Sequence, residues 1–267
     1  PAHEIFPEPR QQAYIDILFP GSNMVPHAMN LFLPWEIRQD GSGLETLNHW
    51  GRHEQLSFFE RSLNDDPALV PFNYQAPMRP NQHQTDNMHD LRERPDQPGH
   101  FVAVRTVEFG VRGAGQLIRV GPATAGASAS LTRTADLTHP NTYGFRDDNA
   151  PERPGDSGRY RDPVPLGDGR LLAAHSLETR AEATTSSNTT EVINGQTVTV
   201  RHPLNRYEFR LRLLAGQDGQ AAATSVALTG DSGIHKTTAF WQPDDLVRYS
   251  DVRLWETDPV ELRPRTP

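Results

Sequence analysis

The chain is 267 residues long, with a formal net charge of -8, a pI near 5.8 and a mean hydropathy of -0.65. That length suffices for one all-β domain or two small ones, and the acidic balance excludes the basic face of a general nucleic-acid binder. The absence of cysteine excludes thiolate catalysis, disulfides, Cys-ligated zinc and haem attached through C-x-x-C-H. No apolar run reaches the roughly 18–20 residues of a membrane span, so we expect no transmembrane segment.

The N-terminal part predicts strands and tight turns. Residues 13–19 form a strand candidate, and the first clear element is a hairpin over residues 35–47. Its strands alternate apolar and charged residues, and Asp40-Gly41 supplies the turn, because Gly allows the positive φ that a tight hairpin loop needs. Strand, tight turn and strand in this order are typical of a β-propeller blade. Residues 55–61 follow as a strand or a short turn of helix.

The middle of the chain alternates between loops and strands. Residues 71–99 are rich in Pro and polar side chains, which predicts a long irregular loop with one helical turn over 88–92. Two strands are predicted within residues 100–120, and 121–163 is predicted to be loop. Residues 164–175 then repeat the opening pattern, with a Gly-Asp-Gly turn followed by an apolar strand.

The C-terminal part contains the clearest strand signals. Residues 178–191 are rich in Thr, Ser and Ala and predict a flexible excursion. Residues 192–200 predict a hairpin with Asn194-Gly195 as a type I′ turn. Residues 207–213 alternate strictly between apolar and polar side chains, which indicates a half-exposed strand. Further strands are predicted within 248–262.

These elements predict an all-β fold of β-propeller-like blades with a β-rich C-terminal region, long irregular loops and few short helices. Residues 1–125 would form the blade-like region and 126–163 a linker or long loop. Residues 164–267 would complete the propeller or form a β domain of their own. Because the chain starts at Pro1 within a blade-like pattern, we expect a piece of a longer protein or a processed one.

One group of side chains could bind a metal. His49, His53 and Glu54 lie close together, and residues 49 and 53 would share one face of a strand because their separation is even. Imidazole and carboxylate ligands suit a divalent metal, so these three residues are the candidate ligands. The alternative is a structural network of ion pairs and hydrogen bonds that pins one blade to the next. No other cofactor is predicted.

Two Gly-Asp-Ser-Gly segments, at 155–158 and 230–233, resemble the nucleophile segment of serine proteases, and residues 171–176 resemble a protease histidine segment. We reject His175 and Ser232 as a catalytic base and nucleophile, because a triad needs side chains from distant strands of two barrels. Gly-Asp-Ser-Gly is also ordinary turn chemistry. The four tryptophans are predicted to fill the core or cap blades.

Several stretches together resemble one family. They are residues 45–54, 64–67, 108–110, 158–166 and 254–262. The chain resembles exported proteins related to the hydrazine synthase alpha subunit, which carry a propeller of TolB/WD40-like repeats followed by a β-rich domain. The resemblance implies a periplasmic or cell-surface location and a propeller-linked fold. It does not carry over the synthase activity, which depends on covalent haem that a chain without cysteine cannot hold in that way.

From the sequence we therefore expect an exported binding or assembly module with no catalysis in this stretch, with a protein partner or a larger complex. The alternative is a metal-dependent redox or hydrolytic enzyme that uses His49, His53 and Glu54. A third possibility is a subunit of a large respiratory or photosynthetic assembly.

Overall fold

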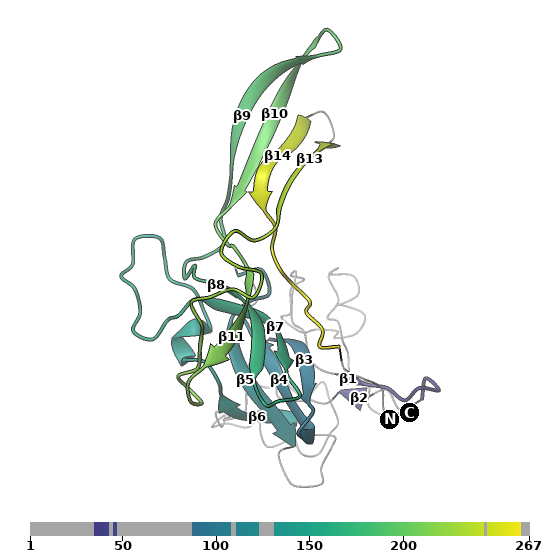
Figure 1. The fold of residues 1–267 in the computed structure, drawn as a ribbon, viewed down its shortest axis with the longest axis vertical. Coiled ribbons are helices and arrows are strands. Elements are labelled where there is room, and N and C mark those ends of the chain that lie inside the picture. Colours follow the sequence, from purple (N-terminus) through teal and green to yellow (C-terminus); the bar gives the residue numbers. More distant parts are fainter. Residues whose placement is uncertain are drawn as a thin grey trace, which may run out of the picture.

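The computed structural model describes residues 35–42, 45–46, 87–107, 111–122, 131–242 and 245–262. Within these ranges the chain is built of strands, and the one helical segment is the 3₁₀ turn η3 at Pro140–Thr142. The strands form three four-stranded sheets and one two-stranded pair (Figure 1). The all-β prediction is confirmed, although the described sheets form no closed ring. In the part of the chain that the structure describes, no helix is long and apolar enough to cross a membrane.

The first sheet is an antiparallel meander, in which each strand pairs with the next one along the chain. Its strands are β3 (Met88–Arg94), β4 (Gln97–Arg105), β5 (Gln116–Pro122) and β6 (Leu131–Asp136). Successive side chains of a strand point to opposite faces. Ala103 and Ile118 therefore belong to a cluster on one face, whereas Val102, Val104 and Leu117 belong to a cluster on the other.

The second sheet packs against the first through this second cluster. Its strands are β7 (Arg159–Pro165), β8 (Leu171–Ser176), β11 (Arg210–Ala215) and β12 (Ala222–Ala223), in the order β12-β11-β8-β7. Tyr160 and Ala173 are fully buried against Val102, Val104 and Leu117. Burying each aliphatic side chain contributes about 1.5–3 kcal/mol, so this interface holds the two sheets together.

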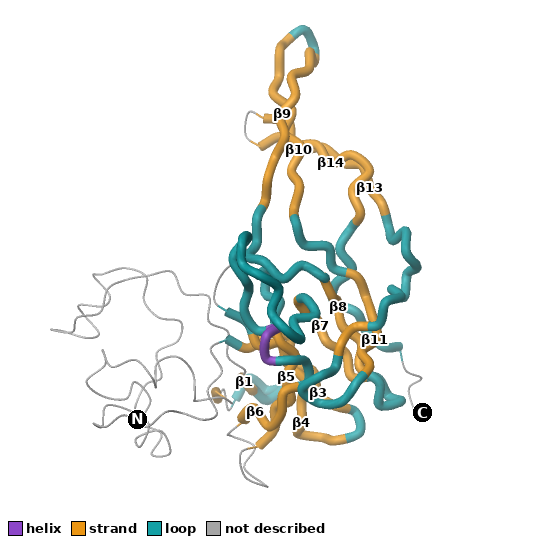
Figure 2. The backbone as a smooth tube through the Cα atoms, turned by 90° about the vertical axis from the view of Figure 1, so that its left-hand side faces the viewer, coloured by secondary structure: helices purple, strands orange, loops and turns teal. Residues whose placement is uncertain are grey.

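The third sheet projects from the other two, and we call it the arm (Figures 1 and 2). Its strands are β9 (Thr184–Ile193), β10 (Gln196–Asn205), β13 (His235–Gln242) and β14 (Asp245–Arg253), in the order β13-β14-β10-β9. Two antiparallel hairpins meet where β10 and β14 run parallel, with Val200 opposite Leu246. The β9–β10 hairpin is an insertion between β8 and β11 of the second sheet.

The arm has little core of its own. Val200, Leu246 and Val247 are buried, while all eight residues of β13 are exposed. Two ion pairs join strands of the arm, Arg201 with Asp245 and Arg248 with Glu191. These pairs are substantially exposed, so each stabilises the arm only modestly.

Two predicted hairpins are confirmed. Asn194 and Gly195 have φ of 54° and 80°, as a type I′ turn requires, and the hairpin that they close is β9–β10. Near the N-terminus, β1 (Trp35–Glu36) pairs with β2 (Glu45–Thr46). The turn between these strands places Gly41 at φ 80°.

Three local predictions were wrong. The helical turn expected over 88–92 is part of strand β3, and the flexible excursion expected over 178–191 contains β9. The loop expected over 121–163 contains β6 and the start of β7. In each case pairing with a neighbouring strand overrides the local composition, since β propensity depends strongly on such context.

Candidate functional site

The candidate metal ligands His49, His53 and Glu54 lie outside the residues that the structure describes. Among the described residues, no group of three or more His, Asp or Glu side chains is placed to hold a metal ion. Two cavities and a pair of carboxylates among the described residues are therefore the features considered as a candidate site.

The larger cavity lies at the base of the arm, where the chain leaves the second sheet, and we call it the arm-base cavity. Its volume is about 780 Å³. Six arginines line it: Arg146, Arg180, Arg206, Arg210, Arg212 and Arg253. Guanidinium groups recognise carboxylate and phosphate, so their arrangement decides what the cavity can bind.

Four of these arginines are held by carboxylates. Arg180 binds Glu178 in a bidentate pair, and the hydrogen bonds from Arg180 lower the pKa of that carboxyl to about 2. The other three pairs are Arg206 with Asp148, Arg210 with Glu256, and Arg253 with Glu208. These groups form a wall whose charges are already balanced.

Arg146 and Arg212 differ from the other four. Arg146 donates to the Thr179 hydroxyl at 2.8 Å and to the Ala150 carbonyl at 2.7 Å. Arg212 donates to the carbonyls of Thr224 and Ser225, and its buried Nε has no hydrogen-bond partner. Within the described part of the chain, neither guanidinium makes an ion pair with a carboxylate, although the carboxylates of Glu152 and Asp231 also line the cavity.

His175 also lines this cavity and is 3% exposed. It lies on β8 between Tyr160 of β7 and Arg210 of β11, because the sheet register places these three residues side by side. Its Nε2 lies 2.6 Å from the Ser157 carbonyl, which can only accept a hydrogen bond. Burial lowers the pKa of His175 to about 4, and the charge of Arg212 adds to the shift. The ring is therefore neutral at pH 7, with Nε2 as the donor and Nδ1 as an acceptor.

The first Gly-Asp-Ser-Gly segment supports the ring of His175. Gly158 has φ 105°, and a Cβ there would collide with the Ser176 carbonyl and lie 2.8 Å from His175 Nε2. Asp156 forms ion pairs with Arg153 and the fully buried Arg159, which fixes the turn. The segment is a structural turn, as its composition predicts.

The geometry gives no support to a protease site. His175 contacts the main-chain carbonyl of Ser157, while the Ser157 hydroxyl lies 2.7 Å from the Tyr160 hydroxyl. The Ser232 carbonyl contacts His235 instead, at 3.0 Å. No hydrogen bond between His175 and Ser232 occurs among the described residues.

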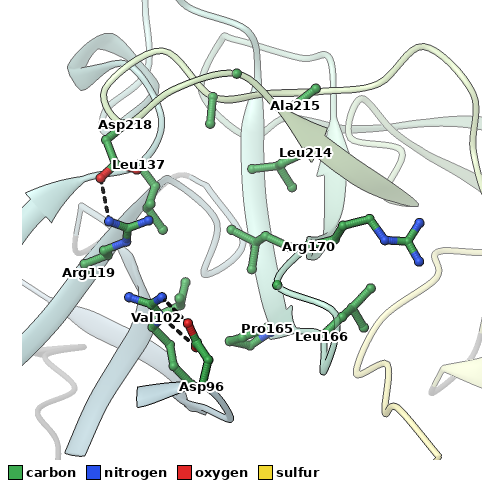
Figure 3. A pocket seen from close by; sticks show the side chains of 15 residues that line it. Asp96, Val102, Arg119, Leu137, Pro165, Leu166, Arg170, Leu214, Ala215 and Asp218 are labelled. Carbon is green, nitrogen blue, oxygen red and sulfur yellow. Dashed lines mark hydrogen bonds and ion pairs between the residues drawn. The ribbon is translucent and has the colours of Figure 1, made fainter. Parts of the chain in front are cut away.

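A smaller cavity of about 280 Å³ lies between the two packed sheets (Figure 3). Val102, Leu137 and Leu214 give it an apolar lining. On one wall Arg119 pairs with Asp218 at 2.6 Å, and a second ion pair joins Arg94 with Asp96. Because both charge pairs are internally balanced, the cavity offers an apolar surface with no free charge on that wall.

Two carboxylates meet where the first strands of the two sheets lie together. Asp90 of β3 and Asp162 of β7 have φ of 52° and 49°, and each lies within an irregularity of its strand register. The Asp162 main-chain N–H donates to Asp90 Oδ2 at 3.3 Å. Burial and the negative charge of Asp162 raise the pKa of Asp90. Asp90 therefore binds a proton more readily than a free carboxyl group does, and the charge of Arg161, which pairs with Asp162, opposes this shift.

The tryptophan prediction holds at one of the two described side chains. Trp255 packs edge-on against Phe209 and donates from Nε1 to the Tyr207 carbonyl at 2.9 Å. Trp241 is 55% exposed on β13, so of the two predicted roles, filling the core or capping a blade, the first is wrong for this residue. Its neighbour Phe240 is 46% exposed and stacks on Tyr249.

The arm-base cavity was not anticipated from the sequence. Arg210 and Arg212 alternate with apolar residues in β11, which indicates a polar face but not what that face meets. The remaining arginines of the cavity come from loops and from the arm, and only the folded chain brings them together.

Comparisons with protein-family models, with curated proteins and with solved structures found no match for the chain.

Proposed function

We propose that this chain is an exported binding and assembly module of the β-propeller type, with no catalysis in this stretch, and that it belongs to a larger complex. The resemblance to relatives of the hydrazine synthase alpha subunit motivates the proposed periplasmic or cell-surface location. The strand order of the two packed sheets supports the propeller type.

A propeller blade is a four-stranded antiparallel sheet, and blades pack face to face around an axis. The first sheet is such a meander, and the second has the same strand order once the β9–β10 insertion is set aside. The contact between Asp90 and Asp162 places the first strands of the two sheets beside each other. Neighbouring blades of a propeller would bring their innermost strands together in the same way.

The observation that carries the binding role is the edge of the arm. Strand β13 lies at one edge of its described sheet, and its side chains are all exposed. An edge strand can pair with an extended segment of another protein, which gives affinity through main-chain hydrogen bonds. Exposed aromatic side chains are enriched where proteins bind one another.

The two halves of β13 differ in a way that locates the docking segment. Lys236 and a register shift between residues 236 and 238 disrupt the first half, and both features discourage edge pairing. Residues 238–242 pair regularly with β14 and carry Phe240 and Trp241 on opposite faces. We assign this segment to an extended, largely apolar strand of a protein partner.

The experiment compares the native assembly of three forms expressed in the native host: wild type, the double variant Phe240→Ser/Trp241→Ser, and the control Val192→Ser. Val192 is 73% exposed near the tip of the β9–β10 hairpin, away from the proposed docking segment. Native electrophoresis of gentle extracts and a photo-crosslinker at position 241 provide the two readouts.

We expect the wild type and Val192→Ser to migrate in an assembly larger than the 29.8 kDa chain, with crosslinks from position 241 to one partner. The double variant should lose that assembly while keeping its circular dichroism spectrum. A wild type that migrates as a single chain would overturn the proposal. An assembly that survives in the double variant would show that β13 is not the docking segment.

A further inference from the structure

The two packed sheets carry the same irregularity at the same place in their first strands. In β3 the register with β4 shifts around Asp90, and in β7 the register with β8 shifts around Asp162. Both aspartates have a left-handed main chain, with φ of 52° and 49°. A bulge at an equivalent position, with the same residue type and nearly the same φ, indicates that the two sheets are repeats of one structural unit.

The segment that follows the arm shows the same features a third time. Asp258 has φ 50° and begins the sequence Asp-Pro-Val-Glu-Leu, whereas Asp162 of β7 begins Asp-Pro-Val-Pro-Leu. The residues two positions before the three aspartates are all buried, and they are Met88, Tyr160 and Glu256. The interval before Asp258 is longer because it also contains the four strands of the arm. Residues 256–262 therefore match the first strand of a blade.

A main-chain contact between neighbouring repeats recurs as well. The Tyr160 N–H donates at 3.1 Å to the carbonyl of Gly115, the residue before β5. The Glu256 N–H donates at 3.0 Å to the carbonyl of Phe209, the residue before β11. Strands β5 and β11 are the third strands of their sheets once the β9–β10 insertion is set aside. Residues 256–262 therefore begin beside the second sheet as β7 begins beside the first.

The third repeat differs from the other two in its exposed apolar side chains. In the second sheet, β8 pairs with β7 and places Leu172 opposite Val164, which is half-buried. Val260 stands at the position of Val164 but is 74% exposed, and Leu262 is 91% exposed. Among the described strands, none pairs with residues 257–262. A structural repeat buries its apolar face only against its neighbours, so Val260 and Leu262 mark a contact surface.

We propose that residues 256–262 are the first strand of a third blade, and that Val260 and Leu262 pack against an antiparallel, largely apolar strand that follows in the same polypeptide. In both described sheets the partner strand follows the first strand after a short turn, at residues 95–96 and 166–170. This order favours a partner strand from the same polypeptide, mostly beyond residue 267. The proposal rests on the propeller type proposed above, but not on docking at β13.

The experiment uses the protein expressed from its own gene in the native host, with a photo-crosslinker at position 260. Position 192 is the matched control, because Val192 is a valine with nearly the same exposure, 73%, near the tip of the β9–β10 hairpin. We expect position 260 to crosslink to a peptide of the same polypeptide C-terminal to residue 262, without the added mass of a second protein. Position 192 should give no crosslink to that peptide. Peptide mapping and intact mass under denaturing conditions are the readouts.

Hydrogen exchange of the same native protein tests the strand pairing directly. Amides of residues 260–262 that pair with a neighbouring strand should exchange at least about tenfold more slowly than unprotected amides. The double variant Val260→Ser/Leu262→Ser should lose this protection, while the amides of β8 keep theirs and report a folded second sheet. The control Val192→Ser should keep the protection at residues 260–262.

Three results would overturn the proposal. The first is a native polypeptide with an intact mass of 29.8 kDa, which would be too short to contain the partner strand. The second is a crosslink from position 260 to a different protein. The third is no crosslink from position 260 together with unprotected amides at 260–262. None of these results involves positions 240 and 241, so this proposal and the docking role of β13 can fail separately.

Discussion

Replacing Glu256 tests the contacts that join strand β11 of the second sheet to the segment that follows β14 of the arm. Glu256 accepts hydrogen bonds from Arg210 Nε at 2.8 Å, from the Leu211 main-chain N–H at 2.8 Å and from the Thr229 hydroxyl. The side chains of Arg210 and Glu256 are 4% and 6% exposed. Glu256→Ala therefore leaves a buried guanidinium without its carboxylate.

Breaking a buried ion pair from one side costs about 3–5 kcal/mol. Arg210 keeps its bonds to the Thr229 hydroxyl and the Gly230 carbonyl, so we expect a loss near the lower end, about 3 kcal/mol. In a protein of this size that loss lowers the melting temperature by about 6–12 °C. Urea unfolding followed by circular dichroism measures the free energy directly.

Two further variants separate the explanations. The double variant Arg210→Met/Glu256→Met should be more stable than Glu256→Ala, because it also removes the buried guanidinium that Glu256→Ala leaves without a carboxylate. Asp218→Ala is the control, since its pair with Arg119 is 37% and 44% exposed, and it should cost less than about 1 kcal/mol. A Glu256→Ala loss below about 1 kcal/mol, or a double variant less stable than the single one, would refute the reasoning.

Three more predictions concern pH and backbone geometry. Burial and the charge of Asp162 raise the pKa of Asp90 above 3.8, so protonation of Asp90 stabilises the fold fully below pH 3.8 and less as the pH rises. In urea unfolding, Asp90→Asn should therefore be more stable than the wild type at pH 7 and equally stable near pH 3. The pKa of His175 is about 4, so the NMR signals of its ring should stay constant from pH 8 to 5. The neutral ring favours the folded state by about 3 kcal/mol above pH 6.5, and this contribution to stability should disappear as the pH falls from 6.5 to 4. A ring that titrates near 6.5 would contradict this. Gly158→Ala should cost about 2 kcal/mol or more in urea, because the left-handed φ and the Ser176 carbonyl both oppose a side chain, and a loss within experimental error would disprove that strain.

The sequence is informative wherever one strand carries its own signal. Asn194-Gly195 predicts the β9–β10 turn, since both residues tolerate a positive φ, and the alternation over 207–213 predicts β11. It fails at 88–92, where the polar stretch of β3 is a strand only because β4 pairs with it. The Thr- and Ser-rich β9 fails for the same reason, since its partner β10 supplies the order.

The candidate site depends even more on contacts between distant residues. Arg146 and Arg212 are separated in the sequence by strands β7 to β10 and several loops, yet they line one cavity. The fold alone decides which of the six lining arginines have a carboxylate partner. A histidine in an apolar strand suggests either a core residue or a base, and only the contact with the Ser157 carbonyl shows which nitrogen of His175 carries the proton.

The parallel pairing of β10 with β14 also sets an order of events during synthesis. Val200 can meet Leu246 only after the ribosome has made the last strands, so the β9–β10 hairpin first exists as a two-stranded ribbon with open edges. Such ribbons tend to aggregate when they are apolar. The first seven residues of β9 are all Thr, Ser or Asn. This polar composition keeps the β9–β10 hairpin soluble until β14 has been synthesised and can pair with it.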